Sequence, residues 1–286
     1  MTMAQFKKTS DSLVLFFLYT LSITWFFWIF AILVSRGSIE FIIPPFAFVV
    51  LGAHGPLVAS IILVRRQSRA SGLRSFLLSG LIPKLPLRWW LVSILAPLAI
   101  AAVAFLAGVL FHEVQPSTSL LLDNPYMIPG TFLFMFFLGG SLQEEFGWRG
   151  YALPRLLQRY NPVVASVVLG VIWGFWHWPL FFITGLSQSF MSFPVFMMLT
   201  LSFSFWFTWL HLKTKGNIFA ALLLHTGLNT AFSVFPPVDQ TQGDSTGMVF
   251  LYLTIIFWIV TGIIIWHQWY IFKDRAGMND PRLANM

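Results

Sequence analysis

Eight apolar stretches occupy most of the 286-residue chain, and they constrain its fold more than any other feature. They run roughly over residues 13–34, 41–64, 90–111, 129–148, 163–183, 190–211, 217–235 and 247–272. Most are long enough to cross a bilayer core of about 30 Å, which takes roughly 20 apolar residues in a helix. Because 57% of the residues are hydrophobic and only 9% are charged, the composition is that of a polytopic membrane protein and not of a soluble core. The sequence therefore predicts an all-α membrane protein, a bundle of about eight transmembrane helices that forms a single domain over residues 1–286.

The basic residues are confined to alternate connections between these stretches. Of the 17 Lys and Arg, all except Arg36 lie before the first stretch, after the second, fourth and sixth, or in the C-terminal tail. The opposite connections carry acidic residues, namely Glu40, Glu113, Asp123, Asp239 and Asp244. By the positive-inside rule both termini are predicted to be cytoplasmic, most simply in a bacterial cytoplasmic membrane. Anionic membrane lipid accounts for the net charge of +7, so no nucleic-acid partner is expected.

The fourth stretch ends in SLQEEFGWRG, residues 141–150, which puts two adjacent carboxylates and an arginine beside an apolar run. An ionised group deep in a bilayer costs roughly 2.5 to 3.5 kcal/mol, so it persists where something pairs with it and is by default a functional hypothesis. On a helix, Glu145 faces Arg149 four residues later, whereas Glu144 is rotated about 100° away. We therefore expect Glu145 to be structural and Glu144 to be available for proton transfer. The alternative is a helix end at the interface with a solvated charge pair.

Two later stretches carry further polar residues. His177 lies among four aromatic residues near the end of the fifth stretch, where it is either part of a site or of an interfacial aromatic belt. His225 and Asn229 are four residues apart in the seventh stretch, so both project from one face of a helix. A His and an Asn aligned inside a membrane helix are hard to explain as lipid-facing, and we expect them to belong to a site.

A carboxylate with two imidazoles supports two related kinds of hydrolytic chemistry. Glu144, His177 and His225 could hold a zinc ion with one position open for water. Alternatively, Glu144 could activate water directly while His and Asn donors stabilise an oxyanion. Both lead to hydrolysis of an amide. Since the chain has no cysteine, thiol nucleophiles, disulfides and thiolate metal ligands are excluded.

These residues fall into three motifs that resemble those of the CPBP family (also called Abi-like). The motifs are EExxxR over residues 144–149, an aromatic residue four before histidine over 173–177, and HxxxN over 225–229. The family comprises the type II CAAX prenyl endopeptidases and membrane proteins of bacteriocin processing or self-immunity. The resemblance covers a core of about residues 130–235. Where the family usually has Phe, this chain has Trp173, which keeps an aromatic wall.

The resemblance implies an eight-helix intramembrane endopeptidase whose site opens toward the cytoplasm. Glu144 would activate water with His177, and His225 with Asn229 would surround the developing oxyanion. Family members are called metalloproteases, so zinc is a possible cofactor, although a metal-free glutamate mechanism fits the CAAX enzymes as well. The expected partners are membrane lipid and a membrane-associated or prenylated, CAAX-type, peptide substrate.

Helix geometry places Glu144 and His177 at different depths in the membrane, which makes a shared site difficult to form. Counted from the cytoplasmic side at 1.5 Å per residue, Glu144 lies about 8 Å deep and His177 about 21 Å deep. A common site therefore requires the first turns of the fifth stretch to protrude into the cytoplasm, or the helices to tilt strongly.

Two other functions fit the same residues. An ion-coupled transporter would use intramembrane acids and histidines as a proton relay, but no internal repeat supports it. A non-catalytic membrane scaffold or bacteriocin self-immunity protein would need no intact Glu144. Replacing Glu144 by alanine separates a scaffold from the other two functions, and substrate cleavage then separates a protease from a transporter.

Overall fold

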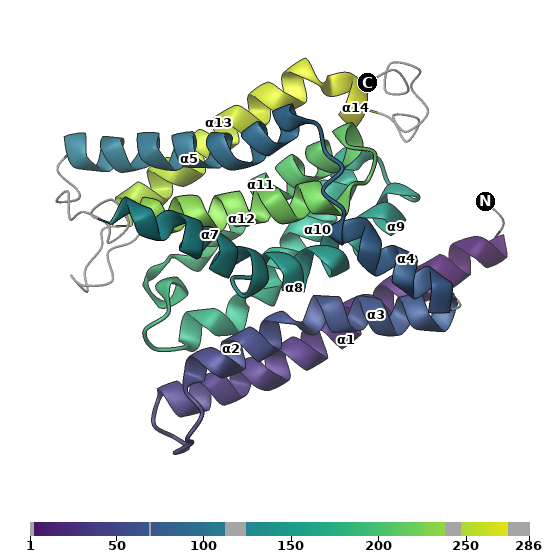
Figure 1. The fold of residues 1–286 in the computed structure, drawn as a ribbon, viewed down its shortest axis with the longest axis horizontal. Coiled ribbons are helices and arrows are strands. Elements are labelled where there is room, and N and C mark those ends of the chain that lie inside the picture. Colours follow the sequence, from purple (N-terminus) through teal and green to yellow (C-terminus); the bar gives the residue numbers. More distant parts are fainter. Residues whose placement is uncertain (1–2, 69, 112–123, 238–246, 274–286) are drawn as a thin grey trace.

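The computed structural model describes residues 3–68, 70–111, 124–237 and 247–273, and these ranges consist of helices joined by turns and irregular connections, with no β-strand among them (Figure 1). The prediction of an all-α membrane protein is confirmed. Seven helical segments are long and apolar enough to cross a membrane: Ser12–Ser35, Pro45–Gln67, Leu87–Leu110, Pro125–Leu157, Pro162–Phe182, Phe193–Lys213 and Met248–His267. The remaining predicted stretch forms a shorter apolar helix, Ile218–Val234. That this helix forms an eighth span stays a prediction.

The helices follow one another with few long connections among the described residues. The N-terminal part contains α1 (Met3–Ser35), α2 (Pro45–Ala53), α3 (Gly55–Gln67), α4 (Ala70–Leu81) and α5 (Leu87–Leu110). The central part contains η1 (Pro125–Met127), α7 (Ile128–Phe137), α8 (Ser141–Glu145), η2 (Phe146–Ala152), α9 (Leu153–Leu157) and α10 (Pro162–Trp176). The C-terminal part contains η3 (Trp178–Phe182), η4 (Ser187–Phe190), α11 (Phe193–Lys213), α12 (Ile218–Val234), α13 (Met248–His267) and α14 (Trp269–Phe272).

The helix α12 is the centre of the bundle. Nearly every residue from Ile218 to Val234 is buried, as expected of a helix that is apolar all round and enclosed by others. It packs against α5, α7, α8 and α11, while α1, α2 and α3 form a separate layer on the other side of α8 and α10 (Figure 1). At the contact with α5, a Cβ on Gly227 would clash with the Ser93 carbonyl oxygen. Glycine therefore sets the close approach of these two helices.

The hydropathy of the fourth apolar stretch indicated one continuous helix over 129–148. The structure shows instead that this helix is interrupted. The helix α7 ends at Phe137, the chain turns at Gly139 and Gly140, and α8 restarts at Ser141. Gly140 has φ +108°, a left-handed conformation that favours glycine. Beyond α8 the chain continues as the π-helical segment η2, a geometry that is often found at functional sites. The break brings the polar residues of α8 into the middle of the bundle.

The first turns of α1 and the short helix α14 lie toward the same end of the molecule (Figure 1). This arrangement agrees with an even number of crossings. Contacts between Arg66 Nη1 and the Tyr19 hydroxyl, at 2.8 Å, and between Arg155 Nη2 and Gln67 Oε1, at 3.0 Å, fasten α3 to α1 and to α9. That this end is cytoplasmic stays a prediction. The acidic residues that were predicted to lie on the opposite side of the membrane, Glu113, Asp123, Asp239 and Asp244, are outside the described residues.

Candidate active site

A cavity of about 360 Å³ lies between α2, α7, α10, α11 and α12. Its wall is mostly apolar, with side chains such as Phe46, Leu138 and Phe232. Four of the six predicted site residues face it: Glu144, His177, His225 and Asn229. The other two, Glu145 and Arg149, do not line the cavity and form a layer behind it. The structure thus brings together residues from the three sequence motifs, which are up to 85 positions apart in the chain.

The layer behind the cavity is a buried ionic cluster. Glu145 Oε1 accepts hydrogen bonds from Arg149 Nη1, at 2.8 Å, and from His225 Nδ1, at 2.7 Å. The Arg149 pair is the one that helical spacing predicts, whereas the His225 partner was not predicted. The guanidinium of Arg149 also lies 4.1 Å from the ring centre of Trp173 and 3.7 Å from that of Phe207, within range of cation–π attraction. Glu145 is therefore held by two donors and is removed from the cavity.

The same contacts fix the orientation of His225. A carboxylate can only accept a hydrogen bond, so the Nδ1 atom that meets Glu145 carries the proton. The Nε2 atom is left to interact with whatever occupies the cavity.

Glu144 has different surroundings, although it is the next residue in the chain. Its Oε2 accepts a 2.7 Å hydrogen bond from the indole Nε1 of Trp173, and its carboxylate lines the cavity. A Cβ on Gly140 would lie 2.6 Å from Glu144 Oε1 and 3.3 Å from His225 Nε2. A carboxylate oxygen and an imidazole nitrogen therefore converge beside Gly140, where any larger residue would obstruct them. This arrangement suits activation of a water molecule by a general base.

His177 lies at the C-terminal end of α10 and is both a cavity residue and part of an aromatic cluster. Its Nδ1 is 2.8 Å from the Trp173 carbonyl oxygen, so Nδ1 donates and Nε2 is left free. Its ring packs edge-on against Trp176, at 4.6 Å between ring centres, and against Phe196, at 5.1 Å. The two interpretations of His177 that the sequence left open are thus compatible. The residue of α10 that donates a hydrogen bond to Glu144 is Trp173, one helical turn before His177. The calculated difference in membrane depth between Glu144 and His177 therefore does not prevent α10 from reaching Glu144.

Asn229 is joined to the turn that precedes Glu144. Its Nδ2 donates a 2.6 Å hydrogen bond to the Gly139 carbonyl oxygen, which ties α12 to the break between α7 and α8. One of the two amide hydrogens of Asn229 is therefore in use, and the other can serve a ligand. The predicted role of Asn229 at an oxyanion stays a prediction.

The predicted zinc site requires that Glu144, His177 and His225 converge on one point. Among the described residues, no three or more His, Asp or Glu side chains are grouped closely enough to hold a metal ion. Two of the four imidazole nitrogens of His177 and His225 already bond to protein oxygens. The side chains as they lie do not form a three-ligand site of Glu144, His177 and His225, so we derive no catalytic step through zinc. A zinc requirement stays a prediction that chelation tests.

Sequence reasoning did not identify Trp173 and Gly140 as site residues. The signal for Trp173 was its replacement of the Phe that the resembling family usually carries, which we interpreted as wall packing only. The signal for Gly140 was the pair Gly139–Gly140 directly before the acidic segment, which is a typical break in a helix.

Comparison with known proteins links these observations to a family. Residues 126–231 match a sequence model described as Type II CAAX prenyl endopeptidase Rce1-like. A curated protein of Methanococcus maripaludis named CAAX prenyl protease 2 is 30% identical over 151 residues, which cover 51% of this chain and 52% of the relative. The chain therefore spans about half the length of the curated relative it matches.

Proposed function

We propose that this chain is an intramembrane endopeptidase, since its residues 126–231 match the Type II CAAX prenyl endopeptidase Rce1-like model. The observation that carries the proposal is the position of Glu144. Its carboxylate lines an apolar cavity between membrane helices, beside an imidazole nitrogen, and is held by a neutral indole donor instead of a cation. Such a carboxylate is available to take a proton from water.

The proposed reaction begins when Glu144 removes a proton from a water molecule beside Gly140. The resulting hydroxide oxygen forms a bond to the carbonyl carbon of the scissile peptide. Negative charge then develops on the carbonyl oxygen, where the Nε2–H of protonated His225 and the second amide hydrogen of Asn229 are proposed as donors. The carbon–nitrogen bond breaks as Glu144 returns the proton to the leaving amine, so one water molecule is consumed and the enzyme is restored.

In the proposed scheme the charges of the cluster cancel. Glu144 and Glu145 together carry two negative charges, and Arg149 with protonated His225 carries two positive charges. A buried cluster of ions is tolerated when its charges are paired and hydrogen-bonded, since an unpaired buried charge is strongly destabilising. We propose that Glu145 acts from behind the cavity by orienting His225, and that Arg149 holds Glu145 in place. His177, with Nε2 free on the same cavity, is proposed to contact the water or the peptide.

The substrate we propose is a peptide at the end of a membrane-associated or prenylated protein. The cavity lies among apolar helices, and residues of α2 and α7 line one side of it. An apolar chain attached to a peptide is compatible with such a wall, whereas a soluble peptide would leave it without apolar partners. A prenylated CAAX-type C-terminus is the first choice, since the similar protein from Methanococcus maripaludis is named a CAAX prenyl protease.

The experiment uses the purified chain in detergent with farnesylated and unmodified versions of one CAAX peptide. Wild type and Glu144→Ala are compared with and without a strong chelator, and zinc is then added back. We expect Glu144-dependent cleavage of the farnesylated peptide that the chelator does not abolish. Loss of cleavage on chelation and its recovery with zinc would instead establish a zinc enzyme. If no membrane-associated peptide is cleaved in a Glu144-dependent way, a bacteriocin-immunity or scaffold role replaces the protease.

A further inference from the structure

We propose that Trp173 is a positioning residue of this active site, because its indole N–H holds the carboxylate of Glu144 in the orientation that activates water. The inference rests on the proposed protease function and goes beyond it, by assigning a role to a residue that otherwise serves only as an aromatic wall. The indole nitrogen is the part that matters, since a phenyl ring could fill the same space but could not donate a hydrogen bond.

The first observation is the geometry of the hydrogen bond. Trp173 Nε1 donates to Glu144 Oε2 at 2.7 Å, which is at the short end of the range for an N–H to oxygen bond. With Oε2 held in this way, Oε1 is the oxygen directed toward Gly140 and His225 Nε2. Among the described residues, no other hydrogen bond to the Glu144 side chain is found. The indole therefore determines which carboxylate oxygen faces the cavity.

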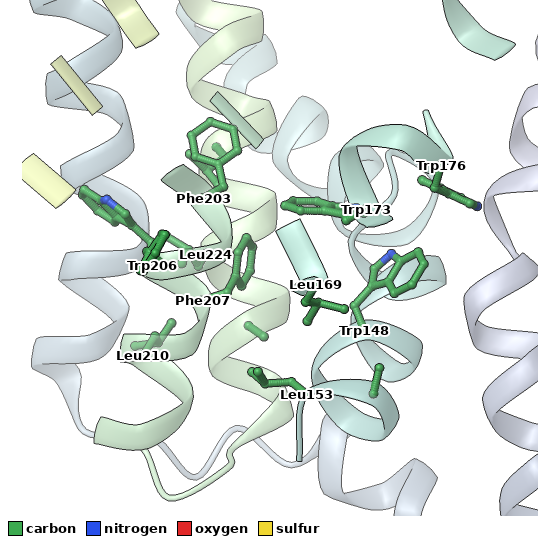
Figure 2. Close-up of a cluster of buried hydrophobic side chains, with 14 of the residues drawn as sticks. Trp148, Leu153, Leu169, Trp173, Trp176, Phe203, Trp206, Phe207, Leu210 and Leu224 are labelled. Atoms are coloured by element: carbon green, nitrogen blue, oxygen red, sulfur yellow. The ribbon is translucent and has the colours of Figure 1, made fainter. Parts of the chain in front are cut away.

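The second observation is that the indole itself cannot swing away. Trp173 is only 4% exposed. One face of its ring meets the Arg149 guanidinium. Its ring also packs edge-on against Phe207, at 5.7 Å between ring centres, and Figure 2 shows these two rings side by side. Since Arg149 is in turn paired with Glu145, the donor is fixed by the ionic cluster behind the cavity. A donor that does not have to reorient is what an electrostatically preorganised site requires.

The third observation is that Trp173 contacts polar residues from each of the three sequence motifs. Its carbonyl oxygen accepts from His177 Nδ1 at 2.8 Å, and its ring lies 5.9 Å from the His225 ring. A single residue of α10 is therefore in contact with residues of all three sequence motifs. The backbone contact with His177 does not depend on the side chain, so a Trp173→Phe substitution removes the donor to Glu144 while keeping the carbonyl and a ring.

Trp148 provides a matched control. It is fully buried in η2, and its indole Nε1 has no hydrogen-bond partner among the described residues. Trp148→Phe therefore makes the same chemical change in the same region without removing a hydrogen bond. Any loss caused merely by a smaller ring in a packed interior should affect both variants.

The first measurement does not depend on catalysis. The chain labelled with 15N-tryptophan gives one indole N–H signal for each of its 13 tryptophans, and the signal missing from Trp173→Phe is that of Trp173. We expect this signal to lie downfield, as a donor to a carboxylate does, and to move upfield in Glu144→Ala, which removes the acceptor. Trp148→Phe should leave it in place. A Trp173 signal that is unchanged by Glu144→Ala would overturn the proposed hydrogen bond, whether or not the chain cleaves a peptide.

The second measurement compares steady-state kinetics of wild type, Trp173→Phe and Trp148→Phe on the same peptide. Loss of one hydrogen bond to an ionised group should lower kcat of Trp173→Phe about 10- to 100-fold, with KM nearly unchanged. Trp148→Phe should keep kcat within about threefold of wild type, as expected for a substitution that removes no interaction at the site. Equal kcat values in the two variants, with an active wild type, would overturn the inference alone. A wild type that cleaves no peptide would overturn the proposed function, while the NMR result still decides the hydrogen bond.

Discussion

The two neighbouring glutamates of α8 occupy opposite environments. Glu145 is fully buried, accepts hydrogen bonds from a guanidinium and an imidazole, and does not reach the cavity. Glu144 is 5% exposed, accepts one hydrogen bond from a neutral indole, and lines the cavity. The difference arises because consecutive helical residues point about 100° apart. Glu145 therefore points toward α12, where it meets His225, whereas Glu144 points into the cavity.

This comparison shows how a membrane protein can keep a reactive carboxylate among apolar helices. In the ionic cluster of Glu145, Arg149 and His225, both basic side chains donate hydrogen bonds to the Glu145 carboxylate, and the cluster packs behind the cavity wall. Glu144 lies next to that cluster without being neutralised by a direct ion pair. We therefore expect substitutions behind the cavity to affect stability first, and substitutions facing the cavity to affect turnover first. The predictions below follow from that division.

The largest effect is expected for Glu144→Gln. The amide keeps the size of the side chain and can still accept from Trp173, but it cannot take a proton from water. Cleavage should fall by about 10³-fold or more, within the range for loss of a general base, while the thermal midpoint stays within a few degrees of wild type. Peptide turnover and thermal unfolding of the same detergent-solubilised samples provide the two readouts. A Glu144→Gln variant that keeps near-wild-type turnover would contradict the division.

Arg149→Ala is expected to act on stability. It leaves Glu145 with His225 as its remaining partner and removes the guanidinium from between two aromatic rings. Breaking a buried ion pair from one side typically costs about 3 to 5 kcal/mol. The folded yield and the thermal midpoint should therefore drop together, and whatever activity remains should scale with the folded fraction. Normal stability with abolished turnover would place Arg149 in the chemistry instead.

Gly140→Ala is expected to lower both stability and turnover, because Gly140 lies in the turn before α8 and next to the Glu144 carboxylate. The added methyl group would sit 2.6 Å from Glu144 Oε1 in a left-handed backbone conformation, φ +108°. Strain of this kind costs of order 1 to 3 kcal/mol, and displacement of the carboxylate should lower kcat by at least tenfold. Gly130→Ala is the matched control, since a Cβ there meets nothing within 4 Å and the residue has no positive φ. Equal activity of the two variants would show that Gly140 does not hold the turn for Glu144.

Asn229→Ala should have a small effect on stability. It removes the 2.6 Å hydrogen bond to the Gly139 carbonyl, which is worth about 1 kcal/mol. If Asn229 is also an oxyanion donor, kcat falls about 10²-fold or more, whereas a purely structural tie lowers it by less than about tenfold. Kinetics with the farnesylated peptide, beside thermal unfolding, separate the two roles. Either result refines the catalytic scheme, and an unaltered kcat would remove Asn229 from it.

The sequence predicted the parts of this architecture that depend on periodicity and charge. Hydropathy indicated the apolar helices, and the spacing of Glu145 and Arg149 predicted their ion pair, because both follow from local helix geometry. The spacing could not reveal that His225, 80 positions away, shares the same carboxylate. That contact depends on how α12 packs against α8, which the spacing of residues within one helix does not determine.

The interruption of the fourth stretch was the other unpredicted feature. An average over an apolar window does not register a turn at Gly139 and Gly140, nor the π-helical segment that follows α8. These local features displace the acidic residues relative to α10, so that Trp173 and not His177 meets Glu144. The depth calculated for a straight helix was therefore a poor guide to which residues of α10 reach the site.

The central claim is that Glu144, and not Glu145, is the carboxylate that activates water. The most direct test is the turnover per folded molecule of Glu144→Gln beside that of Glu145→Gln, with folded protein quantified in each sample by size-exclusion chromatography. We predict that Glu144→Gln is inactive while well folded, and that Glu145→Gln gives less folded protein whose surviving molecules retain at least tenfold more turnover than Glu144→Gln. A well-folded Glu145→Gln that is as inactive as Glu144→Gln, or more so, would contradict the account.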